Sequence, residues 1–327
     1  MAQSVTTLGS WEAEEVPLAQ VESALRELRR QEERAAVRAS VLTFVVVIDD
    51  RDQAPTILDV VRDLGGQHPS RAVVLVLGGD EASRGVDAQA ALHVAERGGH
   101  AVCFEELVLE VRGRARYHLD SVVGPFTLPD LPVAVWSPFH LPSPGDPLLA
   151  VADRVIIDSR FLPQTEDFFG KVASLARRFP VTDMSWIRLA PWRTLLASLF
   201  DGVGHDFLRG VYRAEVSGNF GPRYLLAGWL ATSLGLPASA VALSAERHVS
   251  ARLSAGAAGH QGCFAVERRG DERVVHSSID VPGLLVHEQV LQLAEQSRSA
   301  VLAEALAHMG RDLVYERALF GALDLLR

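Results

Sequence analysis

The chain has 327 residues, of which 48% are hydrophobic and 22% are charged. A chain of this size and composition buries a sizeable core and favours two domains, which excludes a disordered tail protein and a small disulfide scaffold. The net charge of −9 lies wholly in residues 1–160, with 24 acidic and 15 basic side chains, whereas residues 161–327 hold 17 of each, so neither half offers the basic face that nucleic acid requires.

The first residues and the cysteines indicate the compartment. The N-terminal segment lacks the basic and apolar regions of a signal peptide, and the best apolar run, Val41 to Ile48, is too short to span a membrane. Cys103 and Cys263 each lie in an apolar stretch, which is typical of buried thiols in a reducing compartment. We therefore expect a cytoplasmic protein without a membrane segment, with a thiol switch as a weaker alternative.

Residues 1–40 are predicted to form an N-terminal helical segment. After a polar start, Pro17 suits the first turn of a helix whose apolar residues recur at steps of three and four. They are Leu18, Val21, Leu25, Leu28 and Ala35. The opposite face is charged, so we expect the helix to dock on its own domain through this stripe.

Residues 41–160 are predicted to form an α/β domain with a Rossmann-like mixed sheet. Two continuous β-branched runs, 41–48 and 71–79, flank a helical pattern that ends at Gly65 and Gly66, which predicts a βαβ unit with parallel strands. The segments 89–96 and 100–113 predict a hairpin, which makes the sheet mixed. Further short strands are expected at 133–136 and near the end of 146–159.

Residues 161–327 are predicted to form a separate α+β domain. Helical patterns and strand-like patterns alternate there without an internal repeat. The helices are expected within 167–179, 190–202 and 221–235, the strands within 207–218, 241–249 and 262–280 with a turn at Gly270 and Asp271, and a last long helix near 286–309.

Acidic residues at strand ends give one candidate chemical site. Asp49 and Asp50 end the first buried strand and Asp80 follows the second, at the sheet edge where open α/β folds place ligands. Such a cluster suits a cation or a sugar phosphate, and it supports an alternative function as a small-molecule-binding module or enzyme. A receiver domain would also need a lysine on its last strand, and the chain's one lysine, Lys171, is predicted on a helix outside this domain.

Other catalytic signatures are absent from the sequence. It contains no GxxxxGK[ST] loop, no GxGxxG after a strand, no GxSxG elbow and no HExxH pair. We therefore predict no catalytic residues, no cofactor and no metal ligands.

Trp and Arg residues gather in one segment, DMSWIRLAPWRTLLASLFD (183–201). Trp186, Arg188, Trp192 and Arg193 lie within eight positions around a proline-initiated helix. Trp and Arg are favoured at interface hot spots, so these residues are predicted to bind a protein partner. The competing interpretation is that the indoles pack the joint between the domains and the arginines pair with local carboxylates.

Two further residues are candidates for the same role. Trp136 ends the expected strand at 133–136, where it could line a cleft or cap the core. Arg71, in the segment HPSR, could grip an anion or form a structural salt bridge.

Five segments together resemble the OpcA family, the glucose-6-phosphate dehydrogenase assembly proteins. In chain order they are QHPSRAVVLVLGGD (67–80), SVVGPFTLPDLPVAVWSP (121–138), DPLLAVADRVIIDS (146–159), DMSWIRLAPWRTLLASLFD (183–201) and GRDLVYERAL (310–319). The PDLPV strand and the WxRxxxWR segment are the most specific parts. Residues 203–300 are similar only diffusely, and Ser137 replaces the second residue of a Trp-Trp pair common in the family.

The resemblance implies a non-catalytic accessory protein of bacteria. Such a protein binds glucose-6-phosphate dehydrogenase and promotes its active oligomer, which supports NADPH supply through the oxidative pentose phosphate pathway. It implies two domains and no catalytic residues to carry over. The acidic first half offers an alternative contact with a basic face of the enzyme, which would make association sensitive to salt.

Overall fold

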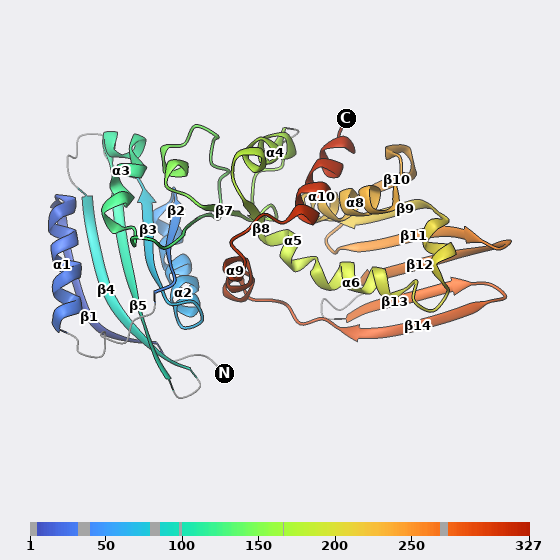
Figure 1. The fold of residues 1–327 in the computed structure, drawn as a ribbon, viewed down its shortest axis with the longest axis horizontal. Coiled ribbons are helices and arrows are strands. Elements are labelled where there is room, and N and C mark those ends of the chain that lie inside the picture. Colours follow the sequence, from blue (N-terminus) through green and yellow to red (C-terminus); the bar gives the residue numbers. More distant parts are fainter. Residues whose placement is uncertain (1–4, 32–39, 79–85, 98–99, 166, 269–273) are drawn as a thin grey trace. The chain divides into compact units, whose positions relative to one another are not determined.

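The computed structural model describes residues 5–31, 40–78, 86–97, 100–165, 167–268 and 274–327. The chain divides into two compact units, each with its own sheet (Figure 1). Unit 1 comprises 1–157, 179–181 and 297–310, and unit 2 comprises 158–178, 182–296 and 311–327. The chain thus leaves the first unit at residue 157, and two later segments return to it, whereas the predicted boundary at 160 kept residues 161–327 together.

The sheet of unit 1 has eight strands in the order β1-β4-β5-β3-β2-β6-β7-β8. The strands are β1 (Val5–Val16), β2 (Leu42–Ile48), β3 (Ser70–Leu77), β4 (Val86–Arg97), β5 (His100–Val111), β6 (Val133–Ser137), β7 (Arg154–Ile157) and β8 (Val181–Asp183). The strands β5, β3, β2, β6 and β7 pair in parallel, and β4 pairs antiparallel with both β1 and β5. The predicted α/β class with a mixed sheet is confirmed.

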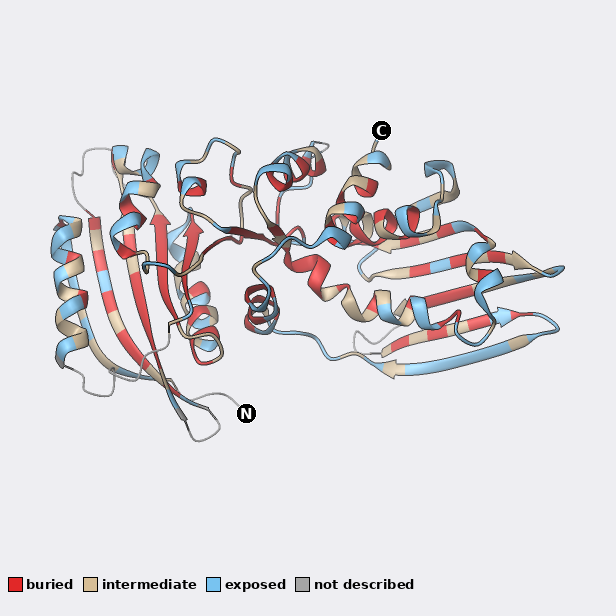
Figure 2. Ribbon diagram, viewed as in Figure 1, coloured by how far each residue is buried: buried red, intermediate tan, exposed pale blue. Residues whose placement is uncertain are grey.

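Helices cover both faces of this sheet, so its central strands are buried on each side (Figure 2). On one face α1 (Leu18–Gln31) and α3 (Leu119–Val123) pack against side chains of β2, β3 and β5. On the other face α2 (Ala54–Gly65) packs against β3 and β5, and α9 (Arg298–Ala307) packs against α2. A strand covered on both faces carries a continuous apolar run, which explains the composition of β2 and β3.

Two neighbouring carboxylates on β5 hold a helix on each face. Successive strand residues point to opposite faces, so Glu105 and Glu106 separate to the two sides of the sheet. Glu105 accepts hydrogen bonds from Arg29 of α1 and Arg71 of β3, at 2.6 Å to the Arg29 Nε and 2.7 Å to the Arg71 Nε. Glu106 accepts two hydrogen bonds, of 2.8 and 2.9 Å, from Arg62 of α2. Burial alone would raise the pKa of both carboxyl groups, but their charged partners outweigh it and lower the pKa.

The sequence prediction missed the first strand. Residues before Pro17 were expected to be a polar start, whereas β1 (Val5–Val16) pairs antiparallel with β4. Half-buried Trp11 and Ala13 on β1 pack against the core under α1. The ladder hydrogen bonds of β1 come from β4, which is distant in sequence. Local propensity therefore does not reveal that this segment is a strand.

Unit 2 contains a six-stranded sheet in the order β10-β9-β11-β12-β13-β14. The strands are β9 (Val211–Gly218), β10 (Val241–Ala245), β11 (Ser250–Ala257), β12 (His260–Arg268), β13 (Val274–Val281) and β14 (Leu285–Gln292). The pair β9 and β10 is parallel, and the other neighbours are antiparallel. The helices are α4 (Phe168–Arg178), α5 (Met184–Arg188), α6 (Ala190–Ser198), α7 (His205–Arg209), α8 (Phe220–Leu234) and α10 (Leu313–Asp324).

The last long helix predicted near 286–309 is wrong. Residues Leu285–Gln292 form β14, which pairs with β13 after a turn at Gly283, whose φ is +81°. Only Arg298–Ala307 are helical there, as α9. Val286 and Val290 are four positions apart, which fits a helical stripe as well as one face of a strand, and the hairpin decides for the strand. The turn predicted at Gly270 and Asp271 lies outside the described residues.

Helices α8 and α10 pack at backbone distance because glycines face each other. A Cβ atom at Gly228 of α8 would lie 2.2 Å from the carbonyl oxygen of Ala318, and one at Gly321 of α10 would lie 2.6 Å from the carbonyl oxygen of Gly228. Neither position has room for a methyl group without moving a helix backbone.

We expect Glu105→Ala to lower the free energy of unfolding by about 3–5 kcal/mol, because it leaves the buried Arg71 guanidinium without its carboxylate. The matched control is Glu22→Ala, which removes an exposed pair with Arg26 and costs at most about 0.5 kcal/mol. Urea titrations of both variants measure the difference. Equal losses would contradict the role assigned to Glu105.

Gly228→Ala should destabilise the protein by about 1–3 kcal/mol, because the added methyl group overlaps the backbone of α10. Gly170→Ala on α4 is the opposite case, since no atom lies within 4 Å of its Cβ position, and it should stabilise by about 0.5–1 kcal/mol. Thermal unfolding should show a lower melting temperature for Gly228→Ala and a higher one for Gly170→Ala than for the wild type. A loss of stability in Gly170→Ala would disprove the distinction.

Candidate functional site

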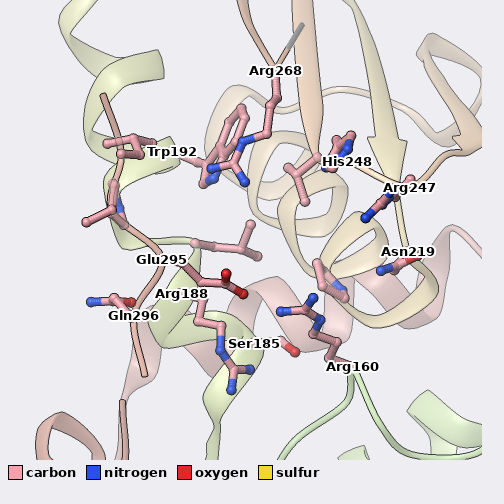
Figure 3. A pocket seen from close by; sticks show the side chains of 16 residues that line it. Arg160, Ser185, Arg188, Trp192, Asn219, Arg247, His248, Arg268, Glu295 and Gln296 are labelled. Carbon is pink, nitrogen blue, oxygen red and sulfur yellow. The ribbon is translucent and has the colours of Figure 1, made fainter. Parts of the chain in front are cut away.

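A cavity of about 830 Å³ lies within unit 2 and is lined by residues from several segments (Figure 3). Its charged and histidine side chains are Arg160, Arg188, Arg247, His248, Arg268 and Glu295. Apolar parts of the wall come from Leu189, Pro191, Trp192, Pro222, Val249 and Leu293. With His248 neutral, the lining residues carry a formal charge of +3.

The short helices α5 and α6 build one wall of the cavity. Asp183 caps α5 by accepting a hydrogen bond of 2.9 Å from the Ser185 backbone N–H. Pro191 stands at the start of α6, where its missing N–H costs no hydrogen bond. Arg188 and Trp192 are four positions apart, and both line the cavity.

Arg188 is fixed by a buried carboxylate. Its Nη1 and Nη2 atoms each lie 2.8 Å from an oxygen of Asp158, whose side chain is 1% exposed. The same carboxylate accepts a 3.3 Å hydrogen bond from the backbone N–H of Arg160. Asp158 therefore positions two of the cavity's arginines, one through its side chain and one through its backbone.

Trp186 and Arg193 stack behind this wall. The Trp186 Nε1 donates a 2.9 Å hydrogen bond to Asp312, the residue that caps α10, and only 3% of Trp186 is exposed. The Arg193 guanidinium lies 3.6 Å from the centre of the Trp186 ring. The structure thus brings together the four residues of the predicted cluster, but only Arg188 and Trp192 reach the cavity.

Trp136 and Arg71 lie elsewhere, in the interior of unit 1. Trp136 on β6 has no exposed surface and stacks on Phe44 with ring centres 6.1 Å apart. Arg71 on β3 is 7% exposed and bonds Glu105 and the carbonyl oxygen of Phe126. Both side chains pack and stabilise the sheet of unit 1, and neither offers surface to a partner.

The acidic strand-end cluster has no cation-binding geometry in the part of the chain that the structure describes. Asp50 accepts a hydrogen bond from the Asp52 backbone N–H, and Asp49 lies 3.2 Å from the Nδ1 of His140. Asp80 lies outside the described residues. No group of three or more His, Cys, Asp or Glu side chains among the described residues is arranged to hold a metal ion.

Sequence reasoning missed most of the cavity. Arg160, Arg247 and Arg268 come from three distant segments, and Figure 3 shows their side chains approaching the cavity from different sides. No spacing rule connects them, because the sheet and α8 bring them together only after folding. Cys103 lies on β5 of unit 1 and Cys263 on β12 of unit 2, and the two are not joined in a disulfide.

Asp183 is the strongly perturbed acid of this unit. Burial, and after it the negative charge of Asp158, together raise the pKa of its carboxyl group to about 6, against hydrogen bonds from Ser159 and Ser185 that lower it. Its Oδ1 accepts from the backbone N–H groups of Ser159, at 3.1 Å, and Ser185. It has no exposed route to a ligand, so its role is to hold the chain around α5.

Each of the two units contains a mixed sheet, and the second unit also holds a cavity lined by arginines. The chain is therefore an α/β protein of two units. No helix in the described part of the chain has the length and apolar composition needed to cross a bilayer. Family models described as the N-terminal and C-terminal domains of a glucose-6-phosphate dehydrogenase subunit match residues 61–178 and 179–319. The chain belongs to this family, OpcA, as the resemblance indicated.

Two cyanobacterial relatives carry the name OpcA and are assigned by name to the OxPP cycle. The one from Synechocystis is 28% identical over 185 residues, which are 52% of this chain and 38% of the relative. The one from Nostoc punctiforme is 24% identical over 318 residues, which are 81% of this chain and 66% of the relative. The chain therefore spans less than two thirds of the length of either relative.

Asp183→Asn should remove a pH dependence of stability. A carboxyl whose folded-state pKa is raised from 3.8 to about 6 stabilises the fold when it is protonated, and this contribution is lost as the pH rises from 4 to 6. The loss amounts to about 3 kcal/mol for this shift. The wild-type unfolding free energy minus that of the variant should fall by this amount over that range. A constant difference between the two proteins would refute the assignment.

Proposed function

We propose that this chain is a non-catalytic accessory protein that binds glucose-6-phosphate dehydrogenase and favours its active oligomer. The observation that carries the proposal is the match of residues 61–178 and 179–319 to the N-terminal and C-terminal domains of a glucose-6-phosphate dehydrogenase subunit. An activator must bind one state of its enzyme more tightly than another, because equal affinity shifts no equilibrium. A tenfold shift in the equilibrium between two states of the enzyme needs a difference in binding free energy of only about 1.4 kcal/mol.

The contact surface is proposed to include β14 at the edge of the sheet of unit 2. This strand ends the strand order, and its residues are mostly exposed (Figure 2). Val286 is 72% exposed and Val290 is 60% exposed, with Leu284 beside them at 56%. An exposed edge strand with apolar side chains is a ready surface for pairing with another chain.

The two tryptophans of the Trp and Arg cluster contribute to binding indirectly in this proposal. Trp186 and Trp192 are 3% and 6% exposed, so they offer little area to a partner. Arg188 and Arg193 are half-buried and remain candidates for direct contact. Substitution of the indoles would change packing as well as contacts, so the exposed residues of β14 give the cleaner test.

Adding this protein to glucose-6-phosphate dehydrogenase should raise its activity and shift its oligomeric state in light scattering. Val286→Lys combined with Val290→Lys should lower the affinity for the enzyme at least about tenfold, because apolar anchors buried at an interface contribute about 2 kcal/mol or more. Co-elution with the enzyme measures this loss. The matched control is Tyr212→Lys, which changes a residue that is 55% exposed on β9 of the same sheet.

The outcomes separate the parts of this proposal. If the wild-type protein changes neither activity nor oligomeric state, the proposed function is wrong. If it does both and the β14 variant binds like the wild type, β14 is not the contact. A strong loss of binding with added salt, in place of a β14 effect, would favour a contact through the acidic first half.

A further inference from the structure

The charged residues that line the cavity of unit 2 are mostly basic. They are four arginines and one glutamate. Arg188 is paired with the buried Asp158, whereas Arg160, Arg247 and Arg268 line the cavity from other segments. Guanidinium groups collected around a concave site are the usual means of holding phosphate or carboxylate groups.

The N-terminus of α8 adds to this positive potential. The helix runs from Phe220 to Leu234, 15 residues, and its N-cap residue Asn219 and first-turn Pro222 both line the cavity. The first backbone N–H groups of a helix have no partner within it, and they carry the positive end of the helix dipole. The first turn of α8 contains no acidic residue, and the Asn219 side chain does not cap it. An anion in the cavity would therefore meet both the arginines and this helix end.

Size and apolar lining indicate an organic anion rather than a bare ion. A volume of about 830 Å³ is in the range of cavities that take metabolite-sized ligands. Trp192, Leu189 and Val249 supply apolar wall beside the charged groups. Arg268 lies over the Trp192 ring at 5.7 Å, so its guanidinium is held at the border between the apolar and charged parts.

We propose that this cavity binds an organic phosphate. Its phosphate group is held by Arg160 and Arg247 at the N-terminus of α8, and its carbon skeleton lies against Trp192. Arg160 and Arg247 are both exposed residues at the cavity, on segments that precede and follow the sheet's β9-α8-β10 unit. Glu295 also lines the cavity, and its negative charge weakens anion binding. This proposal does not depend on the dehydrogenase.

The test is calorimetric titration of the full chain at low ionic strength with glucose 6-phosphate, adenosine 5′-phosphate, inorganic phosphate, and the unphosphorylated glucose and adenosine. The phosphate esters should bind and the unphosphorylated compounds should not. Whichever ester binds more tightly identifies the skeleton as a sugar or a nucleoside. Binding of inorganic phosphate as tight as that of both esters would overturn the role of Trp192 and the apolar wall.

Variants test the charged groups with opposite signs. Arg160→Gln combined with Arg247→Gln should weaken ester binding at least about tenfold, because each loses a charge-assisted hydrogen bond. Glu295→Gln should strengthen it about two- to fivefold by removing a like charge. The control is Arg209→Gln, an arginine of the same unit that is 83% exposed and does not line the cavity, and it should leave affinity unchanged.

Two results would overturn the proposal. One is ester binding that is the same in the wild type and the arginine double variant while both are folded by circular dichroism. The other is no ester binding at millimolar concentration. If in that case the double variant also fails to co-elute with glucose-6-phosphate dehydrogenase, the arginines receive an acidic side chain of a protein partner instead.

Discussion

The buried carboxylate of Asp158 is the constraint on which the cavity of unit 2 depends. It holds Arg188 through two hydrogen bonds of 2.8 Å and the backbone of Arg160 through a third. The Asp158 side chain is 1% exposed, and a buried charge is costly unless it is paired and hydrogen-bonded. These bonds therefore restrict the positions that residues 158–160 and α5 can take. Burial is the main cause of the raised pKa of Asp183, and the neighbouring charge of Asp158 adds to it.

Unit 1 uses the same principle on a sheet. Adjacent glutamates of β5 point to opposite faces, and each binds an arginine of the helix that covers that face. Ion pairs with strict geometry fix how the helices dock on an apolar sheet that would accept many positions. Arg71, for which the sequence allowed either an anion contact or a structural salt bridge, forms a salt bridge with Glu105 in this arrangement.

These observations change how the Trp and Arg residues act in the proposed function. Trp186 joins α5 to the cap of α10, and Trp192 forms part of the cavity wall. We propose that they contribute to binding by shaping unit 2, and that the exposed groups of β14 and the arginines of the cavity contact other molecules. A protein with both features can bind a partner and a small anion at separate places in one unit.

The sequence by itself determined the βαβ unit, the hairpin, the helix at 18–31 and the family, because continuous apolar runs, turn residues and specific segments such as PDLPV are local signals. It could not determine β1 or β14, whose patterns are ambiguous until they pair with β4 and β13. It placed Trp186, Arg188, Trp192 and Arg193 in one segment but could not show which of them are buried. The cavity was decided only by tertiary structure, since Arg160, Arg247 and Arg268 are distant in sequence and meet only where the sheet, α5 and α8 pack together.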